Sequence, residues 1–254
     1  MAKTTAKQLA KAAENWQRCR QEDLPRAFFA YDGEQQLSKR VVSYRLEGKK
    51  ELEALTKDIG KQDEFYYMVH LGLRDMDLQG PIGERPLFTM YIQLVKRGKK
   101  KQREAQELDW YKDSRFGKLM EDGTKSGLNA IPAASAYLFV QAWLELPEIA
   151  LARPFTAEYR VLGERVKSYV FSVAESKSIY LDLKNSKEDR LDIHLGKGMA
   201  VWDHPFSFRP VVEVKRAVAP GKVRTTPMNA TGLLNPEGDS FYDFGRPVPP
   251  GKPG

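Results

Sequence analysis

Two stretches of the chain alternate apolar and polar positions with the period of a β-strand. Along Phe65–Arg74 the odd-numbered positions from 65 to 73 are all apolar, and the positions between them are mixed. Residues 87–96 repeat this pattern, and a loop with Gly80-Pro81 separates the two stretches. Successive side chains of a strand point to opposite faces, so the alternation predicts a half-buried antiparallel hairpin with a long loop.

Shorter patterns of the same kind occur on both sides of this hairpin. They predict strands at residues 28–31, 41–46, 155–162, 167–173, 178–183, 191–195 and 206–218. Pro210 lies near the start of the last of these. Because proline has no N–H to donate to a ladder, it places that start at a sheet edge or a bulge.

Helical spacing of apolar residues, at intervals of three and four, appears in a different set of segments. This spacing, together with local composition, predicts helices at residues 4–22, 50–59, 104–112 and 132–146, of which the third is polar. The first carries basic residues on its other faces, which fits either a helix packed through Trp16 or a basic arm that contacts a partner or nucleic acid. The last begins at Pro132 and is apolar on most sides, so we expect it inside the protein.

Strands before and after a central helix favour an α+β fold over a parallel one. We therefore expect mainly antiparallel sheet, in one sheet or two, with a buried central helix. We divide the chain into an N-terminal helix or arm (1–24), an α+β body (25–218) and a Pro/Gly-rich extended tail (219–254). The tail clusters aromatic residues beside acidic ones, a pattern seen in docking peptides. With Trp16, these aromatic residues are the candidate partner-binding residues: Phe241, Tyr242 and Phe244.

Composition narrows the class of protein. The 254 residues are 41% hydrophobic and 30% charged, which is ordinary for a globular chain long enough to bury a core. The sequence has no apolar run of the ~20 residues needed to cross a bilayer and no signal peptide pattern, which predicts a cytoplasmic protein without membrane contact. Its one cysteine, Cys19, excludes an internal disulfide and a cysteine-rich zinc site, and we expect no cofactor or metal.

The standard catalytic motifs do not occur. There is no phosphate-binding loop, no G-x-G-x-x-G after a strand, no G-x-S-x-G elbow and no kinase signature. The three histidines, His70, His194 and His204, are scattered and form no H-E-x-x-H pair. The sequence thus favours a non-enzymatic protein.

The segment Val211-Val212-Glu213-Val214-Lys215-Arg216 resembles the E-x-K strand of the PD-(D/E)-x-K nucleases. The resemblance implies that Glu213 and an upstream aspartate, Asp203 or Asp192, bind a divalent metal and that Lys215 orients the attacking water. Acid-x-Lys triplets also occur elsewhere, at 47–49, 175–177 and 182–184.

The chain is basic, with a formal net charge of +7 and its densest cationic run at residues 97–103. Cations that follow phosphates and strand aromatics that stack on bases are typical of proteins that bind single-stranded nucleic acid. This hypothesis assigns the contacts to Arg97, Lys99, Lys100, Lys101, Arg103, Tyr67 and Tyr91. Two alternatives stay open: an assembly protein whose N-terminal helix and C-terminal tail contact neighbouring subunits, and the metal-dependent nuclease.

Overall fold

The computed structural model describes most of the chain. The described residues are 6–31, 37–60, 62–74, 85–99, 102–112, 133–157, 165–186, 190–199, 206–214, 240–242 and 246–248. The helices are α1 (Ala6–Arg18), α2 (Lys49–Thr56), α3 (Ala133–Leu144) and α4 (Val173–Asn185), with short 3-10 turns η1 (Leu24–Phe28), η3 (Glu148–Ala150) and η4 (Arg153–Phe155). The strands are β1 (Phe29–Tyr31), β2 (Leu37–Arg40), β3 (Ser43–Glu47), β4 (Phe65–Leu73), β5 (Phe88–Lys96), β6 (Gln106–Glu107), β7 (Asp109–Trp110), β8 (Ser168–Val170), β9 (Arg190–Lys197), β10 (Phe208–Val214), β11 (Ser240–Tyr242) and β12 (Arg246–Val248).

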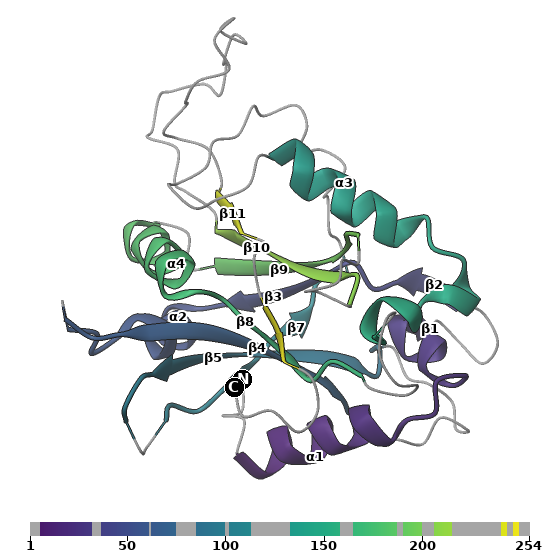
Figure 1. Ribbon diagram of the computed structural model, residues 1–254, viewed down its shortest axis with the longest axis horizontal. Helices are drawn as coiled ribbons and strands as arrows, with labels where there is room; N and C mark the ends of the chain where they lie inside the picture. Colours follow the sequence, from purple (N-terminus) through teal and green to yellow (C-terminus); the bar gives the residue numbers. More distant parts are fainter. Residues whose placement is uncertain are drawn as a thin grey trace, which may run out of the picture.

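Two antiparallel five-stranded sheets form the body of the protein. Sheet I has the strand order β11-β10-β9-β3-β7, and sheet II has the order β12-β8-β4-β5-β6. A separate two-stranded ribbon pairs β1 with β2. Figure 1 shows α3 on the outer side of sheet I and α1 on the outer side of sheet II. The α+β class with antiparallel sheets is therefore confirmed, and the sheets number two in the described part of the chain.

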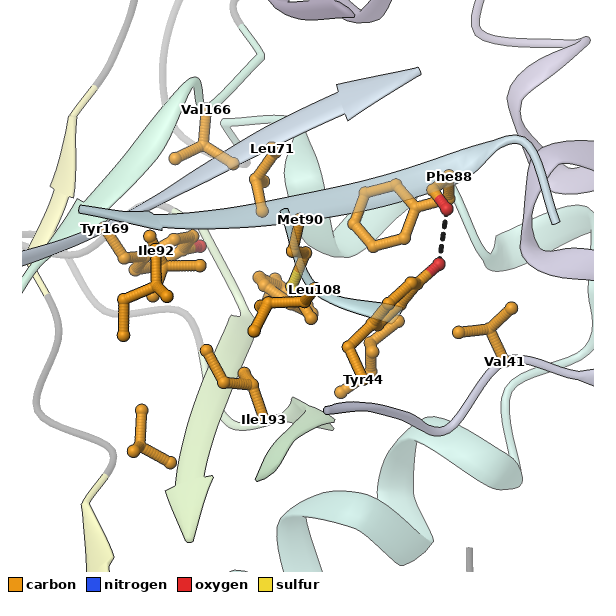
Figure 2. Close-up of a cluster of buried hydrophobic side chains, with 14 of the residues drawn as sticks. Val41, Tyr44, Leu71, Phe88, Met90, Ile92, Leu108, Val166, Tyr169 and Ile193 are labelled. Atoms are coloured by element: carbon orange, nitrogen blue, oxygen red, sulfur yellow. Dashed lines mark hydrogen bonds between the residues drawn. The ribbon is translucent and has the colours of Figure 1, made fainter. Parts of the chain in front are cut away.

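The hydrophobic core lies between the sheets. Every second residue of β9, from Leu191 through Ile193 to Leu195, is buried in one cluster with the inner side chains of β4 and β5. Figure 2 shows Ile193 from sheet I facing Met90 and Ile92 from sheet II. This is the two-residue period that the sequence displays along 65–73.

A hydrogen bond inside this core joins the two sheets. The hydroxyl of Tyr44 on β3 donates to the carbonyl of Phe88 on β5 and so links the two sheets (Figure 2). A buried hydroxyl without a partner would cost about 1–3 kcal/mol, which is why this tyrosine needs the carbonyl.

Glycines let both outer helices approach their sheets closely. A Cβ on Gly72 of β4 would lie 2.9 Å from the Cβ of Ala12 on α1, and a Cβ on Gly196 of β9 would lie 2.9 Å from the Cβ of Phe139 on α3. Helix α3 buries the side that carries Val140 and faces sheet I. Its opposite side is open to solvent, where Leu138 is 65% exposed. The helix expected at 132–146 thus covers a sheet from outside.

The open edges of the two-sheet stack are closed by segments that cross from one sheet to the other. On one side, β6 of sheet II and β7 of sheet I are separated only by Leu108, which is buried in the core. On the other side, β11 joins sheet I and β12 joins sheet II. The helix predicted at 104–112 is wrong, since this segment contains the two edge strands β6 and β7 and no helix.

Helix α4 replaces the strand predicted at 178–183, and that prediction is also wrong. The helix begins with a capping box in which Ser172 and Glu175 each bond the other's backbone N–H. These reciprocal bonds satisfy two N–H groups that a helix start would leave without partners. The spacing Ser-x-x-Glu was visible in the sequence and is the signal that the strand assignment overlooked.

Among the helices in the described ranges, none combines the length and the apolar character of a bilayer-spanning segment.

Candidate functional site

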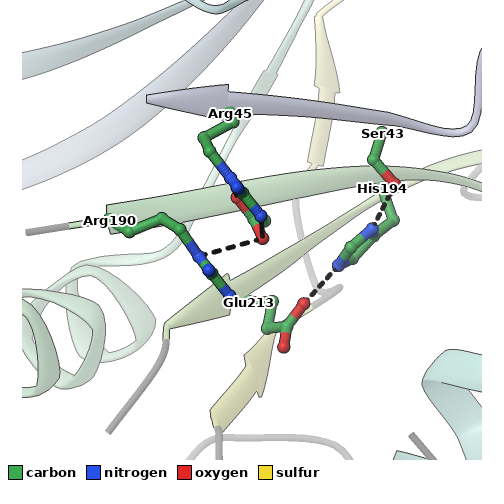
Figure 3. A network of polar contacts seen from close by, with 6 residues as sticks. Ser43, Arg45, Arg190, His194 and Glu213 are labelled. Atoms are coloured by element: carbon green, nitrogen blue, oxygen red, sulfur yellow. Dashed lines mark hydrogen bonds and ion pairs between the residues drawn. The ribbon is translucent and has the colours of Figure 1, made fainter. Parts of the chain in front are cut away.

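The outer face of sheet I carries a cluster of polar side chains, which we call the outer polar network. Figure 3 shows this network on three adjacent strands. It comprises Ser43 and Arg45 of β3, Arg190, Asp192 and His194 of β9, and Glu213 of β10. In the strand register Ser43 lies opposite His194, and Asp192 lies opposite Glu213, so alternate positions of the three strands meet on one face.

Three of these side chains form a continuous hydrogen-bonded chain. The Oγ of Ser43 lies 2.7 Å from Nδ1 of His194, and Nε2 of His194 lies 2.6 Å from Oε2 of Glu213. In the neutral tautomer that carries its hydrogen on Nε2, His194 donates to the Glu213 carboxylate and accepts at Nδ1 from the Ser43 hydroxyl.

This row of three hydrogen-bonded side chains differs from a serine hydrolase triad. In the triad the serine contacts Nε2 and the acid contacts Nδ1, whereas here Ser43 contacts Nδ1 and Glu213 contacts Nε2. All three side chains are also buried, and Ser43 lies within a strand in the interior of the sheet. The arrangement favours a structural role, in which His194 ties three strands together.

The second half of the network is a buried ion pair. The guanidinium of Arg45 donates to both carboxylate oxygens of Asp192, at 2.7 and 2.9 Å, and lies 3.5 Å from the centroid of the Tyr111 ring. Nε of Arg190 lies 3.4 Å from the same carboxylate. Both carboxylate oxygens of Asp192 therefore accept hydrogen bonds from the guanidinium of Arg45.

These contacts bear on the nuclease hypothesis. Asp192 and Glu213 are direct cross-strand neighbours, as that hypothesis requires, but one is held by Arg45 and the other by His194. Asp203 and Lys215 lie outside the described residues. Within the residues that the structure describes, no group of three or more His, Cys, Asp or Glu side chains is placed to hold a metal ion.

The basic run lies at the turn that connects β5 to β6. Arg97 and Lys99 are exposed there, while Arg103 is half-buried and directs its guanidinium to the carbonyls of Ala54 and Lys57 at the end of α2. Lys100 and Lys101 lie outside the described residues. Among the described residues of the run, Arg97 and Lys99 are thus exposed, whereas Arg103 holds the turn against α2.

The two tyrosines assigned to base stacking are buried. Tyr67 lies in the core with its hydroxyl donating to the carbonyl of Leu55 at 3.0 Å. Tyr91 packs between α1 and Ala105, and burial raises the pKa of its hydroxyl to about 12. Neither ring presents a face to a base, so the prediction that they stack on nucleic acid is wrong for this structure.

The candidate partner-binding aromatics serve the fold. Trp16 is fully buried, and its Nε1 donates to the carbonyl of Val166 at 2.7 Å. Helix α1 is therefore packed on the body through Trp16, which is the first of the two alternatives that the sequence left open. Tyr242 is also fully buried and donates to Asp182. Phe241 lies in β11, where only its backbone is described, and Phe244 lies outside the described residues.

Cys19 is a buried thiol at the end of α1. Burial, as the largest effect, raises its pKa, and the guanidinium of Arg165 beside it acts in the opposite direction. Because the thiolate is the nucleophilic form, a raised pKa leaves this cysteine unreactive near neutral pH.

The residues of the outer polar network that sequence reasoning missed are Ser43, Arg45 and Arg190. The available signal was a polar residue at every second position of β3 and β9 within otherwise apolar strands, and the strand pairing needed to join them was not visible. Fold and contacts define the class of the chain as an α+β protein with two stacked antiparallel sheets. No family model, curated protein or solved structure matches the chain.

Proposed function

We propose that the protein is a non-enzymatic nucleic-acid-binding protein that contacts phosphates through the turn at residues 96–103, named here the basic turn. The observation that carries this proposal is the exposure of Arg97 and Lys99 on a turn that side chains hold in shape. Lys100 and Lys101 follow in the sequence, and the chain has a formal net charge of +7. Cations grouped in this way attract the phosphate backbone.

Three hydrogen bonds from one side chain brace the basic turn. The amide of Gln102 donates to the carbonyls of Lys96 and Lys99, at 3.1 and 2.7 Å, and accepts from the N–H of Lys96 at 3.0 Å. A turn held in one shape loses less conformational entropy when it binds a ligand, which favours affinity.

Both ends of the basic turn are attached to the body. Nζ of Lys96 lies 2.8 Å from Asp63, and this hydrogen bond, followed by that from the Gly60 N–H, lowers the pKa of the Asp63 carboxyl. Arg103 holds the other end against α2. Arg97 lies 3.1 Å from Glu64, but both side chains are largely exposed. Exposed pairs of this kind are weak, so a phosphate competes readily for Arg97.

The proposed mode of binding uses charge without base stacking. Tyr67 and Tyr91 are buried, which removes the reason to expect a preference for single strands. We therefore propose that the basic turn binds duplex and single-stranded nucleic acid through their shared phosphates, with little dependence on base sequence.

The test is fluorescence anisotropy of a labelled oligonucleotide titrated with protein. In the turn variant, glutamine replaces Lys99, Lys100 and Lys101. The control variant makes the same change at three exposed lysines on helices: Lys7, Lys177 and Lys184. We expect the turn variant to bind roughly tenfold or more weakly than the wild type at low salt, and the control variant to bind almost normally. Equal losses in both variants would contradict a site at the basic turn.

A further inference from the structure

An acidic residue lies beside an exposed cation of the basic turn. Glu64 comes directly before β4 and Arg97 comes directly after β5, and the N–H of Arg97 donates to the carbonyl of Glu64 at 2.9 Å. This bond extends the β4–β5 ladder by one position beyond the pair of Phe65 with Lys96. The backbone therefore holds the two residues opposite each other, where their side chains can interact.

The side chains of this pair also meet. A guanidinium nitrogen of Arg97 lies 3.1 Å from Oε2 of Glu64, and both side chains are largely exposed. The neighbouring acid behaves differently, because the Asp63 carboxylate accepts from Nζ of Lys96 and from the N–H of Gly60 and so helps to hold the turn. Asp63 thus serves the fold, whereas Glu64 pairs with a residue that we assign to phosphate binding.

A carboxylate and a phosphate compete for the same guanidinium. Both are oxygen anions that accept hydrogen bonds from its N–H groups. While Glu64 is ionised and paired, a phosphate that binds Arg97 must displace the carboxylate and then stays close to its negative charge. Removal of that charge should strengthen the contact of Arg97 with a phosphate, and it leaves the backbone hydrogen bond of the ladder in place.

We propose that Glu64 limits the affinity of the basic turn for nucleic acid by occupying Arg97, an inference that rests on the proposed function. In the free protein Glu64 holds the guanidinium, and in the complex the nucleic acid takes it over. The carboxylate is then an internal competitor of the phosphate. It weakens binding most at low salt, where exposed charges are least screened.

The test is the affinity of the Glu64→Gln variant for a labelled 20-base-pair duplex, measured by fluorescence anisotropy. We expect roughly 2–5-fold tighter binding than that of the wild type at low salt, which is the effect of one exposed ion pair. The slope of log affinity against log salt should steepen by up to about 0.9, because one more cation becomes available to phosphate. Partial unfolding would lower the measured affinity, so a gain reports on the site itself.

Glu14→Gln provides the matched control. Glu14 and Arg18 form a similarly exposed pair at 2.8 Å on α1, so this substitution changes the net charge by the same amount and also releases an arginine. This end of α1 lies at the far end of β4, where Asn15 donates to the carbonyl of Arg74. The nine residues of β4 place that end about 26 Å from the basic turn. We expect the control variant to bind the duplex as the wild type does.

The role of Glu64 can fail while the basic turn stands. If the turn variant binds weakly but Glu64→Gln binds no more tightly than the wild type, Glu64 does not limit the affinity and the proposal is overturned. Equal gains from Glu64→Gln and Glu14→Gln would show an effect of net charge alone and would also overturn it. A turn variant with the affinity of the wild type would remove the proposed function and the role of Glu64 together.

The Arg97→Gln background shows whether Glu64 acts through its partner. There the gain from Glu64→Gln should disappear, because the guanidinium for which carboxylate and phosphate compete is absent. A gain that persists in this background would contradict the proposal that Glu64 acts by occupying Arg97.

Discussion

Replacing Arg45 by methionine should destabilise the protein strongly without touching the core. The substitution keeps an unbranched apolar stem but removes the guanidinium that bonds both oxygens of Asp192. The two side chains are only 13% and 3% exposed, so water replaces the lost partner poorly. Among the described residues, the buried Asp192 carboxylate would keep the longer contact from Arg190 at 3.4 Å.

The size of the effect follows from these contacts. Two hydrogen bonds between charged groups contribute about 1.5–3 kcal/mol each, and breaking a buried ion pair by removing one partner costs about 3–5 kcal/mol. We therefore expect the free energy of unfolding to fall by about 3–5 kcal/mol, a large share of the ~5–15 kcal/mol of an ordinary domain. Urea unfolding followed by tryptophan fluorescence should show the midpoint lowered by about 1–2 M.

The exposed pair of Arg97 and Glu64 provides the matched control. Its side chains are 72% and 58% exposed, and Arg97→Met should cost less than about 1 kcal/mol. If Arg45→Met costs no more than this control, the Arg45–Asp192 pair is not the buried ion pair described here and the structural reading of the outer polar network is refuted.

Three further predictions use the same unfolding assay. Tyr242→Phe should lower the free energy of unfolding by about 1–3 kcal/mol, because it leaves buried Asp182 without that hydroxyl; an unchanged value would place β11 elsewhere. Gly72→Ala should cost about 1–3 kcal/mol, since the new Cβ would lie 2.9 Å from that of Ala12, and a neutral result would contradict the close packing of α1. Burial lowers the pKa of His70 below its ordinary 6.5. The stability contributed by the buried neutral imidazole is therefore present above pH 6.5 and is lost as the pH falls through the folded-state pKa. His70→Gln should remove this loss of stability between pH 7.5 and 5.5. If the variant and the wild type show identical profiles of stability against pH, His70 is not the group responsible.

Periodicity predicted the parts of the fold whose pattern is local. The strand expected at Phe65–Arg74 is β4, the one expected at 87–96 is β5, and the helix expected at 50–59 is α2. Each is long enough for its own period to decide its structure. Segment 104–112 shows the limit, because its edge strands are set by pairing with distant strands and not by the period of its side chains.

The candidate site depended on information that is not local. Tyr67 and Tyr91 occur on strands rich in aromatic residues, and such residues are favoured in strands whether they stack on a base or on the core. Only the placement of α1 over Tyr91, and the burial of Tyr67 in the core beside Leu55 of α2, show that neither ring is available to a base. The exposure of Arg97 and Lys99, in contrast, could be predicted from the sequence, because a dense cationic run is exposed in nearly any fold.

The salt dependence of nucleic-acid binding tests the central proposal most directly. For a labelled 20-base-pair duplex, the logarithm of the association constant should fall linearly with the logarithm of salt concentration, by about 0.9 per phosphate contact. Charge removal at Lys99, Lys100 and Lys101 should reduce that slope by about 2–3 units, whereas the charge-matched control variant should keep the wild-type slope. A turn variant with the wild-type slope would show that the basic turn does not contact phosphates.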